Sequence, residues 1–308
     1  MVNGPRVLVG RRRRLRFQWR LLVGRVVVER RQLRRFRRWR RILVQRWRRL
    51  VTPHIESASN ARILATARLK QRGRREASGL FIVEGRREAE RALAAGTTIA
   101  EVFLCREYAT AGTQTLAEDM AAAGSQLTTT SARAFDKLSM RQHPDGVVAV
   151  APTWDPSIGE LGSSLTLVAE SIEKPGNLGA MFRTADAAGA GLLIVDPNVD
   201  PFNPNVVRAS QGALFSVPFA VTDSSTAIGW ALHRGSLFVG TPDADVEVWD
   251  ADLRGIASIV IGSEHEGASG VWLESGSPVR IPMAGLADSL NASVSAAILL
   301  FEAVRQNR

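Results

Sequence analysis

The sequence predicts an α/β protein with an arginine-rich start, a small α/β domain and a larger domain built on a parallel sheet. From residue 165 onward, apolar strands and helices alternate, which is typical of a parallel sheet covered on both faces. A turn-rich stretch, WDPSIGELGSS (154–164), separates them from an earlier compact run of strands and helices. The predicted boundaries are 1–55, 56–152 and 153–308.

Positive charge is concentrated at the N-terminus. Residues 1–50 contain 19 arginines, no lysine and one acid, Glu29, so this segment carries +18. Because the whole chain carries +10, the remainder carries −8. Three interpretations stay open: a segment that grips phosphates and stacks on bases, a basic amphipathic helix on a membrane surface, or a disordered arm or extension from an upstream start. We assign no function to this segment and favour the third interpretation.

Composition excludes several classes of protein. A chain of 308 residues has room for two domains and a substantial core. The single cysteine, Cys105, excludes a disulfide framework and fits a reducing cytosol, so we expect a cytoplasmic protein. The four histidines are scattered and form no metal cluster with it, so no metal is expected. No apolar run is long enough to predict a membrane span.

The first domain is predicted to begin with a basic helix over residues 60–76. Strands and helices then follow in alternation. The expected strands are 80–85, 99–105, 126–129 and 146–152, and the expected helices are 86–96, 112–124 and 131–139.

The second domain is predicted to contain six strands and four long helices. The expected strands are 165–171, 191–197, 216–221, 236–243, 257–264 and 279–283, and the expected helices are 177–188, 203–213, 224–234 and 291–306. Ligands collect beyond the carboxyl ends of such strands. Three of these ends carry glycine-containing loops, at 240–243, 262–267 and 281–285, which we expect to line one pocket rich in main-chain atoms.

Familiar catalytic motifs are missing from the sequence. It contains neither the dinucleotide-binding glycine pattern nor the triphosphate-binding loop, and no G-x-S-x-G elbow. His265 lies in EHEG rather than in the metalloprotease pattern. A nucleophile or metal must then come from a substrate or cofactor.

The helix over 177–188 presents one arginine in an unusual setting. Asn177 occupies its predicted start, where a side chain is needed to cap free amides. Glycine and alanine lie three or four residues from Arg183, so its guanidinium is unobstructed. A solvated arginine on a capped surface helix explains this pattern as well as a functional one does. The last predicted helix has apolar residues around most of its circumference. It is therefore either buried within its own domain or packed against a partner subunit.

Three segments together resemble the SpoU–TrmH family of RNA ribose 2′-O-methyltransferases, within the SPOUT superfamily. They are EKPGNLGAMFRTADAAGA (173–190), IVIGSEHEGAS (259–269) and IPMAGLADSLNASVSAAILLFEAV (281–304). Their order and spacing match the family's three signature motifs, and 202–218 resembles the segment between the first two. FIVEG (81–85) and HPDGVVAV (143–150) are similar to its substrate-binding domain, which is like an RNA-binding ribosomal protein.

The resemblance implies a methyltransferase domain whose C-terminal segment forms a trefoil knot, and a homodimer formed through the C-terminal helix region. S-adenosylmethionine is bound in the knot, mainly by main-chain atoms. The residues that match the cofactor site are Thr241, Gly262, Ile281, Met283 and Leu290. The residues that match the polar active-site positions are Arg183, Asn177, Glu264, Asn291 and Ser289.

We interpret these positions as follows. Arg183 holds the phosphate and hydroxyl of the target nucleotide and stabilises charge on the attacking oxygen. Asn177 and Asn291 orient neighbouring groups, and Glu264 fixes the glycine-rich loop or the arginine. The residues expected to contact RNA are Arg208, Gln211, Arg72, Arg74, Arg75 and Arg86.

The resemblance therefore predicts methyl transfer from S-adenosylmethionine to a ribose 2′-hydroxyl of RNA. Ribosomal RNA is favoured over transfer RNA by analogy of the two-domain layout. The alternatives are a transfer RNA 2′-O-methyltransferase and a non-catalytic RNA-binding or ribosome-assembly factor. The target nucleotide is beyond what the sequence determines, as is the choice between housekeeping and antibiotic-resistance roles.

Overall fold

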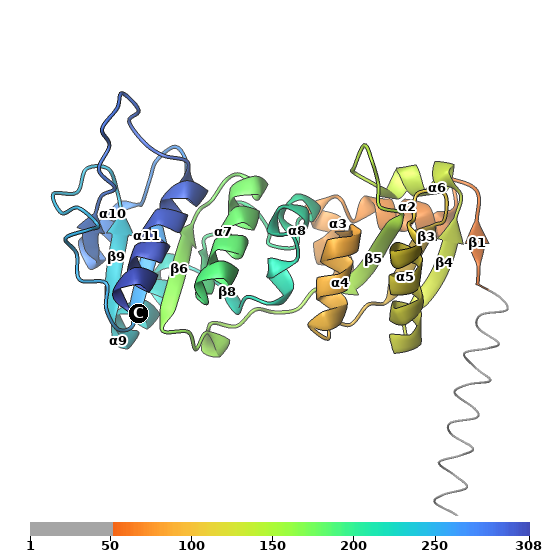
Figure 1. Ribbon diagram of the computed structural model, residues 1–308, viewed down its shortest axis with the longest axis horizontal. Helices are drawn as coiled ribbons and strands as arrows, with labels where there is room; N and C mark the ends of the chain where they lie inside the picture. The colour runs from red at the N-terminus through yellow and green to blue at the C-terminus, as the bar shows by residue number, and fades with distance from the viewer. Residues whose placement is uncertain (1–51) are drawn as a thin grey trace, which may run out of the picture. The chain divides into compact units, whose positions relative to one another are not determined.

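The computed structural model describes residues 52–308, in which residues 53–308 form one compact unit. Two sheets follow one another along this unit (Figure 1). The interpretations of the arginine-rich start concern residues that lie outside the described part. Among the described residues, none of the helices has the length and apolar character needed to cross a membrane.

The first sheet has five strands in the order β1-β4-β3-β5-β2. Strand β5 is antiparallel to both of its neighbours, β3 and β2, and the other two pairings are parallel. The strands are β1 (His54–Ile55), β2 (Leu80–Glu84), β3 (Glu101–Cys105), β4 (Gln126–Thr130) and β5 (Val147–Pro152). The helices are α2 (Ala61–Arg68), α3 (Arg72–Ser78), α4 (Arg86–Ala94), α5 (Ala111–Ala123) and α6 (Ala132–Leu138). Helices α4 and α5 pack on one face, and α6 packs on the other with α2 beside it.

The second sheet has six strands, all parallel, in the order β11-β9-β10-β6-β7-β8. This confirms the predicted parallel α/β domain. The strands are β6 (Leu165–Glu170), β7 (Gly191–Val195), β8 (Phe219–Thr222), β9 (Ser236–Gly240), β10 (Ala257–Ile261) and β11 (Ser277–Val279). Their buried residues are almost wholly apolar, as strands covered on both faces require.

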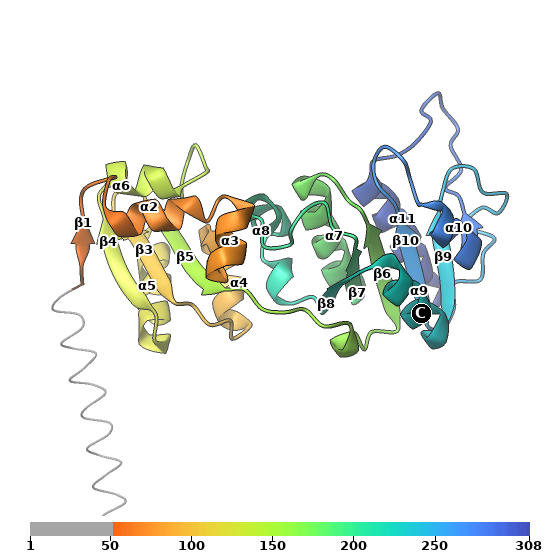
Figure 2. The ribbon, with the colours of Figure 1, turned by 180° about the vertical axis from the view of Figure 1, so that it is seen from behind.

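Helices cover both faces of this sheet. On one face lie α7 (Pro175–Ala188) and α11 (Ala292–Gln306), which also pack against each other. On the other lie α9 (Ser224–Arg234) and α10 (Gly270–Ser275), as Figure 2 shows from behind. The short helix α8 (Pro204–Ser210) packs on α7 and on β2 of the first sheet. Two single 3₁₀ turns, η1 (Ile158–Glu160) and η2 (Ala213–Phe215), complete the described elements. The trefoil knot stays a prediction.

Helix 60–76 is in fact two helices, α2 and α3, because the chain is extended at Gln71, with φ −93° and ψ 133°. The guanidinium of Arg75 reaches back into this break, where its Nη1 donates to the carbonyls of Leu69 (2.9 Å) and Lys70 (3.1 Å). A buried arginine thus satisfies carbonyls that the interrupted helix leaves without partners.

Two other predicted elements are shorter than expected. Helix 203–213 ends at Ser210, because Gln211 and Gly212 have φ of 51° and 90°, which no α-helix continues. The strand predicted over 279–283 is misplaced, because β11 covers Ser277–Val279, and Arg280 has only an isolated bridge with Glu247. Residues from Ile281 onward belong to a loop.

Aromatic side chains join the two sheets. The ring centroid of Phe81, on β2, lies 4.9 Å from that of Phe202, and Trp154 lies 4.7 Å from Phe202 and 5.8 Å from Phe219, on β8. Trp154 comes from the stretch predicted as a boundary. One apolar cluster therefore contains residues of both sheets.

Candidate active site

The candidate site lies at the carboxyl edge of the parallel sheet. Strands β6 and β10 are neighbours and run in the same direction, so the segments that follow them emerge side by side. The segment after β6 leads into α7, and the segment after β10 is the loop 262–269. The positions expected to be polar and functional, Asn177 and Glu264, lie on these two segments.

Glu264 caps helix α7 from a distance of 90 residues along the chain. Its carboxylate accepts hydrogen bonds from the main-chain N–H groups of Glu173 (2.9 Å) and Lys174 (3.2 Å). The residue at the N-cap position, Lys174, makes no side-chain cap of its own. A carboxylate here satisfies free amides and also faces the positive end of the helix dipole.

Asn177 connects Glu264 to the last helix. Its Nδ2 donates to Oε1 of Glu264 (2.5 Å), and its Oδ1 accepts from Nδ2 of Asn291 (3.1 Å). Asn177 is 8% exposed, so these bonds replace water. Asn291 in turn caps α11, since its Oδ1 accepts from the N–H of Ser293 (3.0 Å). One hydrogen-bonded chain, Glu264–Asn177–Asn291, therefore joins a loop and two helix starts.

The surroundings of Glu264 keep its carboxylate ionised. Partial burial by itself raises the pKa of this group, but hydrogen bonds from the Glu173 N–H and the Asn177 amide outweigh burial and lower the pKa below its ordinary value. Glu264 acts here as a hydrogen-bond acceptor and a fixed negative charge.

The loop 262–269 is tight and requires glycine. A Cβ on Gly262 would lie 2.1 Å from main-chain atoms of Gly267 and Ala268. The main chains of Ser263 and Gly267 exchange hydrogen bonds of 3.0 and 3.1 Å, which close the loop, and Gly267 has φ of 71°. This loop presents Glu264 to helix α7.

Arg183 and Ser289 are not part of this hydrogen-bonded chain. Both are exposed, and neither side chain makes a hydrogen bond or ion pair within residues 52–308. Arg183 lies six residues after Asn177 on α7. It is therefore displaced from Asn177 by about 9 Å along the helix axis and by about 240° around that axis. The guanidinium is thus free to meet a ligand or a second chain.

The segment 281–290, which follows β11, is an open loop with exposed apolar side chains. Met283 is 38% exposed and Leu286 is fully exposed. Within the described part of the chain, no main-chain N–H from 281 to 291 donates a hydrogen bond. Of the other expected cofactor residues, Thr241 follows β9 and donates its N–H to the carbonyl of Val279 (3.0 Å). This places the 241 turn next to the start of the loop.

Two family models match separate parts of this chain. The model of the SpoU rRNA Methylase family matches residues 164–301, and that of the MRM3-like substrate binding domain matches residues 60–149. The 23S rRNA (guanosine-2′-O-)-methyltransferase RlmB of Bordetella pertussis is 35% identical over 206 residues, which cover 63% of this chain and 84% of that protein. This chain belongs to the SpoU rRNA methylase family.

Solved structures give the same assignment for the fold. A crystal structure of an RNA 2′-O ribose methyltransferase is 41% identical, with a TM-score of 0.73 over 82% of this chain and 98% of that one. An AdoMet-bound rRNA methyltransferase from Sinorhizobium meliloti is 28% identical, with a TM-score of 0.72 over the same shares. RlmB of Ralstonia nicotianae is 40% identical over 150 residues, which span 47% of this chain and 60% of that protein. The resemblance seen in the three motifs is confirmed.

The residues that this SpoU family member was expected to use for RNA contact lie in different settings. Arg74 and Arg208 are exposed. Arg72 and Arg86 are exposed and pair with glutamates one turn along their helices, Glu76 (2.8 Å) and Glu90 (2.6 Å). Such exposed ion pairs contribute little to folding stability and leave the guanidinium accessible to RNA.

Arg75 is a correction to the expected RNA-contact set. Its side chain is 2% exposed, and its Nε and Nη2 donate to Oδ2 of Asp200 at 2.8 and 2.6 Å. This arginine lies in the contact region between the two sheets, called the joint below, and RNA cannot reach it. Gln211 also lies at this joint, where its Oε1 accepts from Nη1 of Arg87 (2.6 Å).

Glu170 is a residue beside the candidate site that the sequence analysis did not predict. It is 4% exposed at the end of β6, and it accepts hydrogen bonds from the N–H (3.1 Å) and hydroxyl of Ser269. It therefore fixes the far end of the loop whose near end carries Glu264. A charged residue that ends a mostly apolar strand was the available signal. The described residues contain no group of histidine, cysteine or acidic side chains able to hold a metal ion.

Proposed function

We propose that this chain transfers a methyl group from S-adenosylmethionine to a ribose 2′-hydroxyl of ribosomal RNA. The observation that carries the proposal is the hydrogen-bonded chain Glu264–Asn177–Asn291, which draws the segments of the three family motifs together beside an open loop. The family membership supports the reaction. The named relatives support ribosomal RNA, since they act on 23S rRNA by name.

The residues of the loop region fit S-adenosylmethionine chemically. The loop 281–290 offers exposed apolar side chains together with main-chain amides that are uncommitted within the described residues. An adenosine group needs apolar cover and main-chain hydrogen bonds of this kind. Thr241, Gly262, Ile281, Met283 and Leu290 are the residues that would hold it. When bound, this cofactor supplies an electrophilic methyl group.

The chain's own residues then bind and orient the RNA. Arg183 holds a phosphate and the attacking hydroxyl, and its charge stabilises the oxygen as negative charge develops there. Asn177, fixed by Glu264, keeps Asn291 and the start of α11 in place, so the neighbouring Ser289 and loop are held near the reacting groups. We assign no residue as the proton acceptor.

The division of labour between the domains is part of the proposal. Residues 56–152 bind RNA and residues 153–308 carry the reaction, and the family matches at 60–149 and 164–301 support this division. We also propose a homodimer formed through the C-terminal helix region, because Val294 (45% exposed) and Phe301 (42%) leave apolar surface on α11. The proposed setting is the cytoplasm, which is in line with the single cysteine, Cys105.

Replacing Arg183 with alanine tests the assignment. We expect methyl transfer to fall by about 100-fold or more, as when one charge-stabilising donor is removed, while S-adenosylmethionine binding stays nearly unchanged. The measurements are transfer of labelled methyl groups to ribosomal RNA and calorimetric binding of the cofactor. Arg254→Ala is the matched control, since Arg254 is an exposed arginine of the same domain whose one ion pair among residues 52–308 is with Asp252.

Full activity in Arg183→Ala contradicts the role of Arg183. A wild-type chain that binds ribosomal RNA but transfers no methyl group contradicts the enzyme and favours a non-catalytic RNA-binding factor. Mapping of ribose methylation in cells with and without the chain distinguishes the substrates, because a change confined to transfer RNA contradicts ribosomal RNA.

A further inference from the structure

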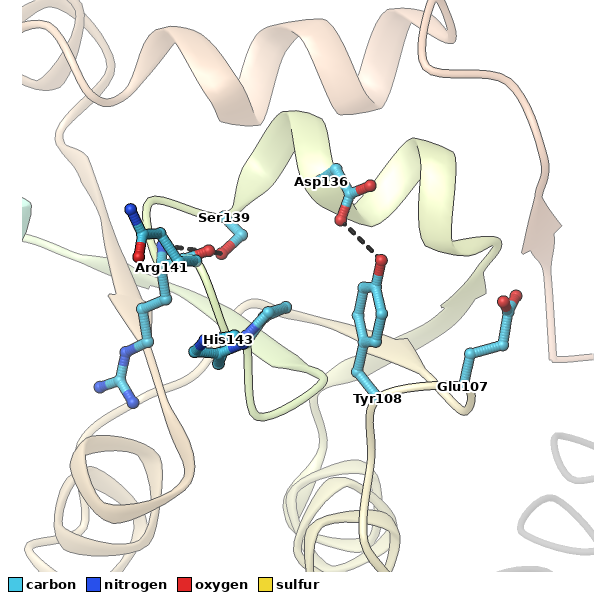
Figure 3. Close-up of a pocket in the computed structure, with 8 residues that line it drawn as sticks. Glu107, Tyr108, Asp136, Ser139, Arg141 and His143 are labelled. Atoms are coloured by element: carbon cyan, nitrogen blue, oxygen red, sulfur yellow. Dashed lines mark hydrogen bonds between the residues drawn. The ribbon is translucent and has the colours of Figure 1, made fainter.

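A polar hollow of about 600 Å³ lies in the first domain, away from the methyltransferase site. Figure 3 shows Tyr108 and Asp136 on one side of it, and Ser139, Arg141 and His143 on the other. Hollows of this size hold small ligands or single groups of larger ones. The methyl-transfer reaction proposed above assigns no role to these residues.

A buried carboxylate and a partly buried arginine hold the segment 139–145, which forms one wall of the hollow. Glu84, 3% exposed on β2, accepts hydrogen bonds from the hydroxyl of Ser139 and the N–H of Met140 (2.9 Å). Arg141 donates to the carbonyl of Glu84 (3.2 Å) and to Oδ2 of Asp145 (2.8 Å). A wall fixed by a buried carboxylate and a bound arginine is ready for a ligand before the ligand arrives, which lowers the entropic cost of binding.

The opposite side offers an aromatic ring and a hydrogen-bond acceptor. The hydroxyl of Tyr108 donates to Oδ1 of Asp136 (3.0 Å), and the Tyr108 ring meets Phe135 edge-on at 6.0 Å. Oδ2 of Asp136 accepts no hydrogen bond from the described residues. A carboxylate accepts only, so it selects a ligand edge that carries donors. Aromatic rings at RNA-binding sites stack on unpaired bases.

Three cationic side chains lie next to the residues that line the hollow. Arg106 precedes the pocket residue Glu107, and Arg133 and Lys137 lie three residues before and one after Asp136 on α6. All three are exposed, and none forms an ion pair within residues 52–308. The exposed cations can bind phosphate groups that lie outside the hollow. The carboxylate oxygen of Asp136 can accept hydrogen bonds from donor groups of the same ligand that lie inside it.

We propose that this hollow binds one unstacked guanine nucleotide of the RNA, with the guanine N1–H and N2 amino group donating to Asp136, the base beside Tyr108 and the adjacent phosphates on Arg106, Arg133 and Lys137. Guanine is the base that presents two adjacent donors on its pairing edge. The proposal rests on RNA being the substrate, which the proposed function supplies. It adds a recognition site remote from the methylated ribose.

Short RNAs test the proposal with the full chain and without cofactor. Fluorescein-labelled UUUGUUU is compared with the same heptamer carrying A, C, U or inosine at the centre, and binding is followed by fluorescence anisotropy. We expect the guanine heptamer to bind about tenfold more tightly than the A, C and U heptamers, the usual size of a two-donor base contact. Inosine lacks the N2 amino group of guanine. The wild-type chain should therefore bind the inosine heptamer with little of the preference that it shows for the guanine heptamer.

Three variants test whether the guanine preference belongs to the hollow. Asp136→Asn replaces one acceptor oxygen with a donor, so we expect it to bind all five heptamers alike. Asp119→Asn changes an exposed aspartate of α5, outside the pocket, and should keep the preference. Arg133→Ala with Lys137→Ala should weaken all heptamers equally and reduce the salt dependence of binding. Guanosine 5′-monophosphate alone should bind more weakly than UUUGUUU, because it reaches fewer of the cations.

Equal binding of all heptamers by the wild-type chain overturns the proposal, as does a guanine preference that survives Asp136→Asn. Guanosine 5′-monophosphate binding as tightly as UUUGUUU overturns RNA as the ligand. The methyl-transfer assay separates this inference from the proposed function. A wild-type chain that transfers methyl groups but shows no guanine preference refutes only the guanine site, and a wild-type chain that shows the preference but transfers no methyl group refutes only the enzyme.

Discussion

Glu264 contributes more than one hydrogen bond to the site, because its charge is placed at the start of α7. We expect Glu264→Gln to lower the free energy of unfolding by about 1 kcal/mol, the usual size of a lost charged cap. The folded-state pKa of Glu264 is lowered, so this stabilisation is fully present above the ordinary pKa of glutamate and is lost as pH falls through the lowered value. The difference between wild type and variant should therefore shrink as pH is lowered from about 6 to about 3.

Urea unfolding at several pH values measures this difference. Glu266→Gln is the matched control, because Glu266 is an exposed glutamate of the same loop whose side chain has no partner within the described residues. Its stability should follow that of the wild type at every pH. A Glu264→Gln difference that stays constant with pH would show that the carboxylate charge does not act on the helix.

Helices α7 and α8 pack so closely that one glycine decides their separation. A Cβ on Gly179 would lie 2.4 Å from Cβ of Ala209 and 2.9 Å from main-chain atoms of α8. We expect Gly179→Ala to destabilise the chain by roughly 1–3 kcal/mol, since α8 has to move away. Denaturant unfolding monitored by circular dichroism measures the change.

Gly176 provides the comparison within the same helix. A Cβ there meets nothing within 4 Å, so Gly176→Ala should be neutral or stabilise the chain by up to about 1 kcal/mol through better helix propensity. Equal effects of the two substitutions would contradict close packing as the reason for glycine at position 179.

The elements themselves follow from local pattern, whereas their contacts do not. Apolar periodicity locates most strands and helices of both sheets, although it misses β1 (His54–Ile55) and α10 (Gly270–Ser275). The family motifs indicate which positions to examine. The contact between Glu264 and Asn177 joins residues 87 positions apart and depends on β10 pairing with β6, which no local pattern specifies. For the same reason the sequence placed Arg75 on the surface, although Asp200, 125 residues away, holds it inside.

At the scale of the whole described molecule, the two sheets share one apolar cluster, and the ion pair between Arg75 and Asp200 lies at the same contact between the sheets. Arg75, from α3, and Asp200, before α8, are 2% and 15% exposed, so their charges interact with little screening by water. Oδ1 of Asp200 also accepts from the N–H of Phe202 (2.7 Å), whose ring contacts Phe81 across the joint. The pair therefore sets the position of the segment that carries Phe202.

A double-mutant cycle on this pair tests how strongly the two sheets are coupled. Asp200→Ala leaves a buried guanidinium without its partner and should cost about 3–5 kcal/mol of unfolding free energy. Arg75→Met removes that charge, so the double variant should be more stable than the sum of the single changes predicts, with a coupling of about 1–3 kcal/mol. The exposed pair Arg72–Glu76 serves as the control cycle and should give a coupling below about 0.5 kcal/mol. Similar couplings in the two cycles would mean that Arg75 and Asp200 are as well solvated as a surface pair, and the joint between the sheets would then rest mainly on its aromatic contacts.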